Sequence, residues 1–403
     1  MRLIHTSDWH LGRLRNGKSF EQTHNLFFKW LIDFINQNKV DLLLVSGDIF
    51  DNPYPSTNVL SFYYKILFEL SQTHLKKIII TGGNHDSASV LNAPKEILDR
   101  INISVIGGMP ENLEQSIIEV ESNGVCRAIV CAVPFLREKD LRKSVVGNDV
   151  ETKKTEIAQA IANLYNAIYE KAKIMNKKNV PIIAMGHLFV SDVNSFSEKE
   201  MELFIGGLQQ LSLNQLPKEF DYFALGHIHR PTIVGGMENI RYSGSPIKLN
   251  FSEKTNSNVI ILVDTAENTI ETIEVPIFRD LVKFQGTFKE VSEAIAEFKS
   301  KSPLKPWAKL SIVEQQKMAD LENKIIDLKE NIKNIDIVDY KFEFTDISNT
   351  LKEKYQKSVS IKEFSPLDVF EMYIDNYNQE EKDILKETFC HLQNNYLYEN
   401  PII

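Results

Sequence analysis

The stretch that decides the fold is Lys77-Ile78-Ile79-Ile80-Thr81-Gly82-Gly83-Asn84-His85-Asp86. Its apolar, β-branched half predicts a buried strand, and the Gly-Gly pair ends that strand. An amide, an imidazole and a carboxylate follow at once, and a buried strand needs none of them in order to fold. Polar side chains in that position indicate a functional site.

Four other segments repeat this pattern of an apolar strand followed by polar side chains. They are residues 3–10 (LIHTSDWH), 42–48 (LLLVSGD), 182–187 (IIAMGH) and 222–229 (YFALGHIH). In an open α/β sheet, ligands bind at the carboxyl ends of the strands. We therefore expect the five polar ends to meet at one place.

The donors at these ends are those of a two-metal centre. They are imidazole nitrogens, carboxylates and an amide oxygen without cysteine, a mixture that suits Mn²⁺, Fe or Zn²⁺ better than Ca²⁺. Asp8 and His10 are two residues apart, so both point to the same side of an extended chain, and His227 and His229 have the same spacing. Asp48 is the natural bridge between two ions roughly 3.5–4 Å apart, the spacing at which paired metals cleave phosphoesters.

Each piece also has an ordinary structural explanation. An aspartate after a strand is often a helix N-cap, Gly83-Asn84 is a common turn pair, and His187 alone is most simply a hydrogen-bonded structural residue. The joint occurrence favours the metal site, because five of the nine histidines follow strand ends in order along the chain.

Together, the motifs resemble those of the calcineurin-like metallophosphoesterases. They are Asp8-x-His10, Gly47-Asp48-x-x-Asp51, Gly83-Asn84-His85-Asp86, His187 and Gly226-His227-x-His229. Residues 7–12 (SDWHLG) and 242–246 (YSGSP) narrow the resemblance to the DNA-repair nuclease branch, and within it to the bacterial SbcD type, relatives of the MRE nucleases. The resemblance extends over nearly the whole chain. It implies an α/β fold with a β-sandwich flanked by helices, a small α/β capping domain and a C-terminal helical partner-binding tail.

The resemblance also implies the ligands and the activity. One metal is held by Asp8, His10, Asp48 and His229, and the other by Asp48, Asn84, His187 and His227. Both ions are expected to be Mn²⁺. The expected reaction is hydrolysis of DNA, as a 3′-to-5′ double-strand exonuclease and as an endonuclease on single strands and hairpins, in repair, recombination and replication. The expected partners are an SbcC ATPase and DNA with double-strand ends or hairpins.

His85 is a catalytic residue by resemblance and not a ligand. Its implied role is to stabilise the scissile phosphate and help protonate the leaving oxygen, which suits imidazole near neutral pH. Asp86 either orients His85 or its loop, or caps a helix. Asp51 matches the bacterial branch, whereas archaeal and eukaryotic relatives carry histidine there, so that histidine's part in handling DNA does not carry over.

Composition is that of an ordinary globular protein with room for a large core and one or two smaller units. The chain has 403 residues, 43% of them hydrophobic and 25% charged. A net charge of −9 argues against nucleic-acid binding through the overall field. Bound metal ions and a partner protein are expected to provide the positive charge that DNA requires.

Location is expected to be cytoplasmic. Three cysteines, Cys126, Cys131 and Cys390, form no CxxC pair and cannot all be bridged, which indicates a reducing compartment. The N-terminus leads directly into a strand, and no apolar run approaches 18 residues. We therefore expect neither an export signal nor a membrane span.

Two helices are predicted beside the first strands. The helix over 21–38 has an apolar stripe that would pack on a sheet. The helix from Thr57 to about Ser71 has two apolar faces, one with Val59, Phe62, Tyr63, Ile66 and Leu70, the other with Leu60, Tyr64, Leu67 and Phe68. Covering a sheet needs only one face, so the second predicts a partner helix, and the resemblance implies a homodimer.

Three segments near the motifs are candidates for substrate contact. Arg13 to Lys18 is a basic loop beside the first ligand pair, with a merely solvated loop as the alternative. Val190 to Lys199 is a polar loop or a disordered one. Arg230 follows two expected ligands, where it could bind a phosphate in bidentate fashion.

Strands near residues 233–234, 240–242, 258–264 and 269–275 predict a second sheet packed on the first. From Pro276 the chain reads β-α-β-α-β, so we expect a nuclease domain over 1–275, a capping domain over 276–350 and a helical tail over 351–403. The cap carries a basic patch with an aromatic residue: Lys299, Lys301, Lys305, Lys309 and Trp307. The resemblance implies that it positions DNA, and the alternative is a solvated face.

The tail begins at Ser365-Pro366, a helix cap followed by proline. Two helical lines of large apolar residues follow, Leu367, Phe370, Ile374 and Tyr377, then Leu385, Phe389, Leu392 and Tyr396. So much apolar surface requires a partner. The resemblance implies the coiled-coil base of SbcC, and folding back on the cap is the alternative.

Two other functions compete with a DNA nuclease. A small-molecule phosphodiesterase or phosphatase shares the fold, but it needs neither cap nor apolar tail. A non-catalytic scaffold would have lost ligands, and here all are intact.

Overall fold

The computed structural model of the chain describes residues 1–141, 150–191, 210–251, 258–315 and 320–344, and single positions between 370 and 389. The chain forms two compact units. The first consists of Met1–Ile312 and Leu321–Lys341, and the second of Val313–Asp320 and Phe342–Ile403. Both large sheets, all the expected metal ligands and most of the capping region lie in the first unit.

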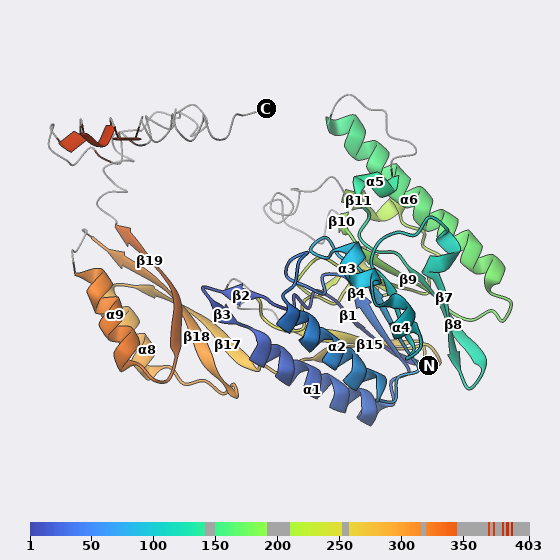
Figure 1. Cartoon of the computed structure of the whole chain (residues 1–403), viewed down its shortest axis with the longest axis horizontal. Coiled ribbons are helices and arrows are strands. Elements are labelled where there is room, and N and C mark those ends of the chain that lie inside the picture. Colours follow the sequence, from blue (N-terminus) through green and yellow to red (C-terminus); the bar gives the residue numbers. More distant parts are fainter. Residues whose placement is uncertain are drawn as a thin grey trace. The chain divides into compact units, whose positions relative to one another are not determined.

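The first unit contains two six-stranded sheets packed face to face (Figure 1). In order across the first sheet the strands are β16 (Thr269–Glu274), β15 (Val259–Asp264), β1 (Arg2–Thr6), β4 (Leu42–Ser46), β5 (Lys77–Thr81) and β6 (Ile103–Ile106). Those of the second are β13 (Thr232–Ile233), β14 (Ile240–Tyr242), β12 (Tyr222–Gly226), β9 (Ile182–His187), β8 (Val125–Ala132) and β7 (Ile117–Ser122). A buried apolar layer that includes Leu44, Ile79, Ile183 and Met185 fills the space between them.

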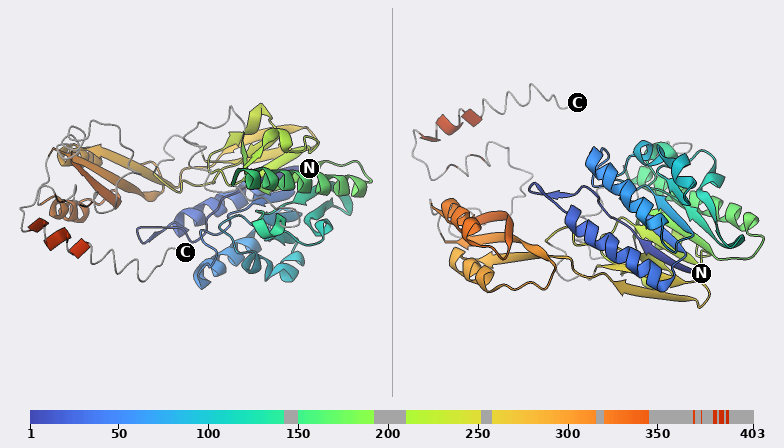
Figure 2. Two further views of the ribbon diagram at one scale, coloured as in Figure 1. Left: turned by 90° about the horizontal axis from the view of Figure 1, so that it is seen from above. Right: turned by 60° about the horizontal axis from the view of Figure 1, so that its bottom comes forward.

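Helices cover the outer faces, because each sheet buries apolar side chains on both sides. On the first sheet pack α1 (Glu21–Asn38) and α2 (Thr57–Ser71), and on the second packs α6 (Val150–Met175). In the right-hand view of Figure 2, blue α1 and α2 lie on one side of this unit and green α6 on the other. The expected sandwich flanked by helices is confirmed.

The predictions for α1 and α2 match the structure. Ser56 caps α2, because its side chain accepts a hydrogen bond from the Val59 N–H. This bond pairs one of the N–H groups that the first turn of a helix leaves without a partner. Asn123 and Gly124, with φ of 54° and 72°, form the left-handed turn that joins β7 to β8.

The prediction for β15 and β16 was wrong. The sequence placed both in the second sheet with β13 and β14, but β15 pairs antiparallel with β1, with Ile4 opposite Leu262, and β16 pairs with β15. Both strands therefore extend the first sheet at the open edge of β1. An apolar strand pattern shows that a strand is buried and not which edge it joins.

The second apolar face of α2 is narrower than predicted. Leu67 is fully buried in the core beneath α2 and belongs to the sheet-covering face. Tyr64 and Phe68 are exposed, at 36% and 59%.

The cap has the predicted β-α-β-α-β order. Its elements are β17 (Arg279–Gly286), α8 (Phe288–Glu297), β18 (Leu304–Glu314), α9 (Leu321–Asn331) and β19 (Asp336–Phe344). The prediction of an exposed aromatic residue there was wrong, because Trp307 is 2% exposed and packs between Phe20 and the Arg279 guanidinium. Lys305 and Lys309 of the same patch are paired with Asp336 and Asp339.

Shorter elements complete the described part of the chain. They are β2 (Leu14–Arg15), β3 (Lys18–Ser19), α3 (Ala88–Asn92), α4 (Lys95–Asp99), η1 (Leu113–Ser116), α5 (Glu138–Leu141), β10 (Phe189–Ser191), β11 (Gln210–Ser212), η2 (Leu213–Gln215) and η3 (Val234–Gly236). Among the described helices, none has the length and apolarity needed to cross a membrane.

Two expectations fall mostly outside the described residues. The polar stretch is described only at Val190 and Ser191. In the tail, the rings of Phe370 and Phe389 stack with centroids 4.2 Å apart, so the two apolar lines meet there. Ser365-Pro366 and most other tail positions lie outside the described part.

Candidate metal centre

The seven expected ligands come from five strand ends on both sheets and lie together at one edge of the sandwich. Asp8 and His10 follow β1, Asp48 follows β4 and Asn84 follows β5 in the first sheet. The second sheet contributes His187 at the end of β9 and His227 and His229 after β12. The two sets meet because β1, β4 and β5 run parallel to one another, as do β9 and β12.

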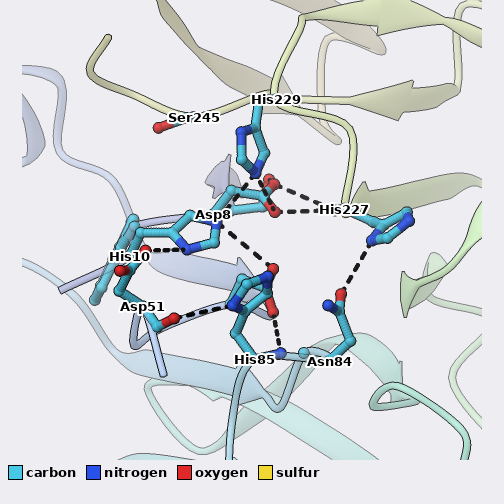
Figure 3. Close-up of polar contacts among 12 residues, drawn as sticks. Asp8, His10, Asp51, Asn84, His85, His227, His229 and Ser245 are labelled. Atoms are coloured by element: carbon cyan, nitrogen blue, oxygen red, sulfur yellow. Dashed lines mark hydrogen bonds and ion pairs between the residues drawn. The ribbon is translucent and has the colours of Figure 1, made fainter. Parts of the chain in front are cut away.

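The first cluster consists of Asp8, His10, Asp48 and His229, each with a donor atom within 4.8 Å of every other. His10 Nε2 and His229 Nε2 are 3.0 Å apart, and His10 Nε2 is 3.6 Å from Asp48 Oδ2. His229 Nε2 lies 4.0 Å from Asp8 Oδ1. Figure 3 shows the His229 ring directed toward Asp8 and His10.

The second cluster gathers around Asn84. Its Oδ1 atom is 3.0 Å from both His187 Nε2 and His227 Nδ1. His187 Nε2 is 3.4 Å from Asp48 Oδ1. Asp48 therefore directs Oδ2 to the first cluster and Oδ1 to the second, the arrangement of a carboxylate shared by two ions.

Unusual backbone conformations aim these side chains. Asp8, His10, Asp48 and His227 all have positive φ, at 53°, 48°, 50° and 100°. Non-glycine residues adopt that region rarely and at an energetic cost, and such strain concentrates at functional sites. Two glycines permit the close packing: a Cβ on Gly83 would lie 2.1 Å from Asp48 Oδ1, and one on Gly226 would lie 1.8 Å from the Ser46 carbonyl.

Surrounding groups fix the orientation of the donors. The Ser46 carbonyl lies 2.9 Å from His187 Nδ1, so the Nε2 atom faces the cluster. Asp8 accepts hydrogen bonds from the Ser7 hydroxyl and the His227 N–H, and Ser7 also contacts Ser243. Such outer contacts set the direction and basicity of metal ligands. These roles were not predicted from the sequence, although Ser7 and Ser243 stand in the quoted motifs.

Asp51 contacts both the first cluster and His85. Its carboxylate is 2.7 Å from Arg13 Nη1 and 3.3 Å from His10 Nδ1, where the alignment is that of an ion pair and not of a full hydrogen bond. Its carbonyl lies 2.9 Å from His85 Nδ1. Asp51 and His85 both line the site in Figure 3.

Asp86 ties two ligand loops together. Its carboxylate accepts N–H groups of Ile49, Phe50 and Gly83, at 3.1, 2.9 and 2.8 Å. These bonds join the loop after β4 to the loop after β5. Of the two roles left open for Asp86, positioning a loop is therefore the one it has, and the residue at the N-cap of α3 is Ser87.

Burial and neighbouring charges set the protonation of the donors. Burial opposes ionisation of Asp48, but the surrounding imidazoles, His187 above all, hold the pKa of its carboxyl below the ordinary range. Burial lowers the pKa of His227 to about 4 and that of His229 to about 3, so both rings are neutral at pH 7. For His187 burial also favours the neutral ring, but the Asp48 carboxylate outweighs it and raises the pKa to about 9.

This donor set fits divalent metals. Without a cation, His10 and His229 must share one proton between two nitrogens, and His187 must stay protonated beside Asp48. A divalent ion in each cluster would replace those protons, as metal binding to histidine does. The mixture of imidazole, carboxylate and amide donors belongs to Mn²⁺, Fe or Zn²⁺.

The basic loop is not the merely solvated loop considered as the alternative. Residues 14–19 form the β2–β3 hairpin, whose Arg15, Asn16 and Lys18 contact Asp339, Val338 and Asp336 of the cap. Arg13 pairs with Asp51. Side chains of the hairpin therefore bind the cap.

Comparisons with known proteins identify the family. The profile of the calcineurin-like phosphoesterases matches residues 1–231, and that of the type 5 capsule protein repressor C-terminal domain matches residues 277–378. The SbcD subunit of the SbcCD nuclease of Escherichia coli (strain K12) is 33% identical over 82% of this chain and 83% of its own length. The chain belongs to the SbcD family of nuclease subunits.

Other SbcD proteins are similar. The SbcD nuclease subunit of Rhodobacter capsulatus is 33% identical over 66% of this chain and 67% of its own length. The SbcD nuclease subunit of Bacillus subtilis is 28% identical over 71% of this chain and 72% of its own length. Among solved structures, a dimetal phosphatase from Danio rerio covers 69% of this chain and 97% of its own, at 11% identity and a TM-score of 0.40.

Proposed function

We propose that this SbcD-family chain hydrolyses DNA phosphodiester bonds at a centre of two divalent ions, with Mn²⁺ as the resident metal. Asp8, His10, Asp48 and His229 would hold one ion, and Asp48, Asn84, His187 and His227 the other. The observation that carries the proposal is the position of Asp48, with one carboxylate oxygen in each cluster.

Bound ions would neutralise phosphate charge and activate water, the chemistry of paired metals on phosphoesters. The protein's own part in proton transfer falls to His85. With Nδ1 facing the Asp51 carbonyl, its other nitrogen is left to stabilise the phosphate and to protonate the leaving oxygen.

The substrate, partner and assembly form part of the same proposal. Relatives are named as subunits of an SbcCD nuclease, which supports an SbcC ATPase partner, bound through the tail. We propose 3′-to-5′ exonuclease action on double-strand ends, endonuclease action on hairpins and single strands, a role in DNA repair, recombination and replication, and a homodimer. The proposed division remains 1–275 for the nuclease domain, 276–350 for the cap and 351–403 for the tail.

A cytoplasmic location is also proposed. Its support is that Cys126 and Cys131 are buried and unbridged, the state that thiols keep in a reducing compartment.

A small-molecule phosphodiesterase is not favoured. The relatives that match over most of their length are named nuclease subunits, and the chain carries the second family domain beyond the phosphoesterase core. A scaffold without activity would not need all seven donors in place.

The test compares wild type, Asp48→Asn and His85→Gln on labelled hairpin DNA with Mn²⁺, with bound metal measured by mass spectrometry. We expect Asp48→Asn to lose both metal and cleavage, because both ions share that carboxylate. His85→Gln should keep its metal and lose about 10²–10⁴-fold in rate, the usual contribution of a general acid.

His74→Gln is the matched control, because His74 is a partly exposed histidine at the opposite end of β5. It should behave as wild type. Full cleavage by Asp48→Asn would refute the metal assignment. Wild-type activity on mononucleotide esters but not on DNA would refute DNA as the substrate.

A further inference from the structure

A cavity of about 270 Å³ lies at the same edge of the sandwich as the candidate metal centre. Its walls come from the ends of β5, β6 and β8 and from α3 and α4, and include Gly83, Ile106, Gly107, Met109 and Phe135. Lys95 and Arg137 stand at the same cavity, with Asp140 as the one acid. We name it the flanking pocket.

The flanking pocket and the metal centre share a wall. Gly83 lines the pocket on one side of the loop whose Asn84 belongs to the second cluster. Phe135 is bound to this loop through its N–H, which donates to the Gly82 carbonyl at 2.8 Å. Its ring meets the His187 ring edge to face, with centroids 6.2 Å apart. One aromatic ring thus separates an expected metal ligand from the cavity.

Arg137, one of the two basic groups of the pocket, is anchored to the same loop. Arg137 Nη2 donates to the Asp86 carbonyl at 2.7 Å, and its backbone N–H donates to Asp140 at 2.9 Å. Lys95 and Arg137 outnumber the single carboxylate, in a chain whose net charge is −9. A local excess of cations beside a phosphoesterase centre suits a second phosphate.

The rest of the lining suits a nucleobase. Phe135, Met109 and Ile106 provide apolar surface, and Gln115 and backbone amides provide a few polar groups. An aromatic side chain with a basic group beside it is how proteins hold single-stranded bases without reading their sequence. Pockets for whole ligands span about 300–1,000 Å³, so this cavity of about 270 Å³ has room for one nucleobase, which must be unpaired to enter it.

We propose that the flanking pocket binds the nucleotide next to the scissile phosphate. Its base lies against Phe135, and the phosphate beyond it is bound by Lys95 and Arg137. This inference rests on the proposed nuclease function and adds a subsite to it. Because only an unpaired nucleotide fits, the pocket favours frayed ends, loops and hairpin tips over intact duplex.

The test measures coupling between Phe135 and a base of the DNA. Hairpin substrates carry one abasic residue on either side of the mapped cleavage site. For wild type we expect kcat/KM to fall about 5- to 150-fold for one of these positions, the range for stacking on an aromatic side chain. Phe135→Leu should show the same loss on intact DNA and no further loss on the abasic substrate. Two results would overturn the proposal. One is that the losses in kcat/KM from Phe135→Leu and from the abasic residue multiply when combined. The other is that wild type cleaves both abasic substrates as well as intact DNA.

A second variant tests the phosphate contact without touching the metal centre. Lys95→Gln should raise KM, leave kcat unchanged and reduce the slope of log affinity against log salt by about 1. The control is Lys178→Gln, an exposed lysine before β9 at the opposite end of the strands, which should change neither. Identical behaviour of the two variants would overturn the role given to Lys95.

Failure of the pocket and failure of the nuclease site give different results. Metal content read by mass spectrometry separates the two, because Phe135 is not a ligand and Phe135→Leu should keep as much bound metal as wild type. If Asp48→Asn is inactive and the abasic coupling is absent, only the pocket is refuted. If Asp48→Asn still cleaves DNA, the nuclease site itself is refuted.

Discussion

Asp51 shows how one side chain outside the ligand set can control a metal site. Its carboxylate lies between Arg13 and His10 Nδ1, while its carbonyl faces His85. A negative group at Nδ1 keeps the proton on that nitrogen, so His10 Nε2 presents its lone pair to the cluster.

Asp51→Asn should therefore weaken metal binding at the first cluster. The amide keeps the shape but loses the charge that orients His10, and removal of such outer contacts typically costs about 10–100-fold in metal affinity. Calorimetric titration of the metal-free protein with Mn²⁺ measures the change. Asp33→Asn, at an exposed position of α1, is the control. Equal affinities for the two variants would mean that Asp51 does not orient His10.

His5 makes the fold sensitive to acid. It is buried on β1 beside the Tyr222 hydroxyl, and burial lowers its pKa to about 3 from the ordinary 6.5. Because the folded pKa is depressed, the neutral ring stabilises the fold above pH 6.5, and this contribution is lost as the pH falls from 6.5 toward 3. One such group contributes up to about 1.4 kcal/mol per pH unit in that window.

His5→Gln should reduce the slope of the free energy of unfolding against pH by up to about 1.4 kcal/mol per pH unit. Urea unfolding in EDTA at pH 7, 6 and 5 gives the free energy of unfolding of each protein. The variant will be less stable at pH 7 but should lose less stability on acidification. His24, whose pKa burial lowers to about 4, remains in both proteins and accounts for part of the residual slope. Parallel curves for variant and wild type would rule out His5 as the sensor.

At the scale of elements, the β2–β3 hairpin connects the first ligand pair to the cap. Asp339 contacts both Arg15 and Lys309, at 3.0 and 2.8 Å, and Asp336 contacts Lys18 and Lys305. The side chains are partly exposed, so each pair stabilises by less than about 1 kcal/mol. Four pairs on two carboxylates form a small network across one contact.

Replacing Asp336 and Asp339 together by Asn should loosen the hairpin without unfolding the core. We expect faster amide exchange over residues 14–19 and cap strand β19, with unchanged exchange in β4 and β5. Hydrogen exchange read by mass spectrometry measures this segment by segment. Asp327→Asn, on the exposed side of α9, should change nothing in the hairpin. Unchanged protection of residues 14–19 in the double variant would show that these ion pairs do not hold the hairpin.

What the sequence predicted depended on how local each signal was. The positions of α1 and α2 followed from the spacing of their apolar residues, because that signal lies within a few residues. The meeting of ligand-bearing strand ends followed from the general rule for parallel strands.

The rest required contacts between distant parts of the chain. The edge of β1 that β15 joins, the burial of Trp307 against Phe20, and the pairing of Arg15 with Asp339 link residues hundreds of positions apart. Periodicity cannot report such partners. In the site, the donors were found from their strand ends, but the outer contacts of Asp8 and His187 depend on Ser243 and Ser46, whose positions only the fold supplies.

At the scale of the whole molecule, α2 leaves apolar surface unburied. After Leu67 joins the core, Tyr64 and Phe68 remain exposed on this helix, and Tyr54 in the segment before it is 85% exposed. Contiguous exposed apolar surface marks sites of protein association. A second copy of the same helix would bury them by two-fold symmetry, the commonest way in which identical chains pair.

Phe68→Asp should therefore convert a dimer into a monomer. A charge placed at the centre of a symmetric contact is buried twice, facing its own copy, so both desolvation and repulsion oppose pairing. Light scattering at micromolar concentration should give twice the chain mass for wild type and the chain mass for the variant. The control is Ile97→Asp on α4, an apolar residue that is 71% exposed, which should remain a dimer. A wild-type chain that is monomeric at this concentration would refute the interface, and a Phe68→Asp dimer would place it on another face.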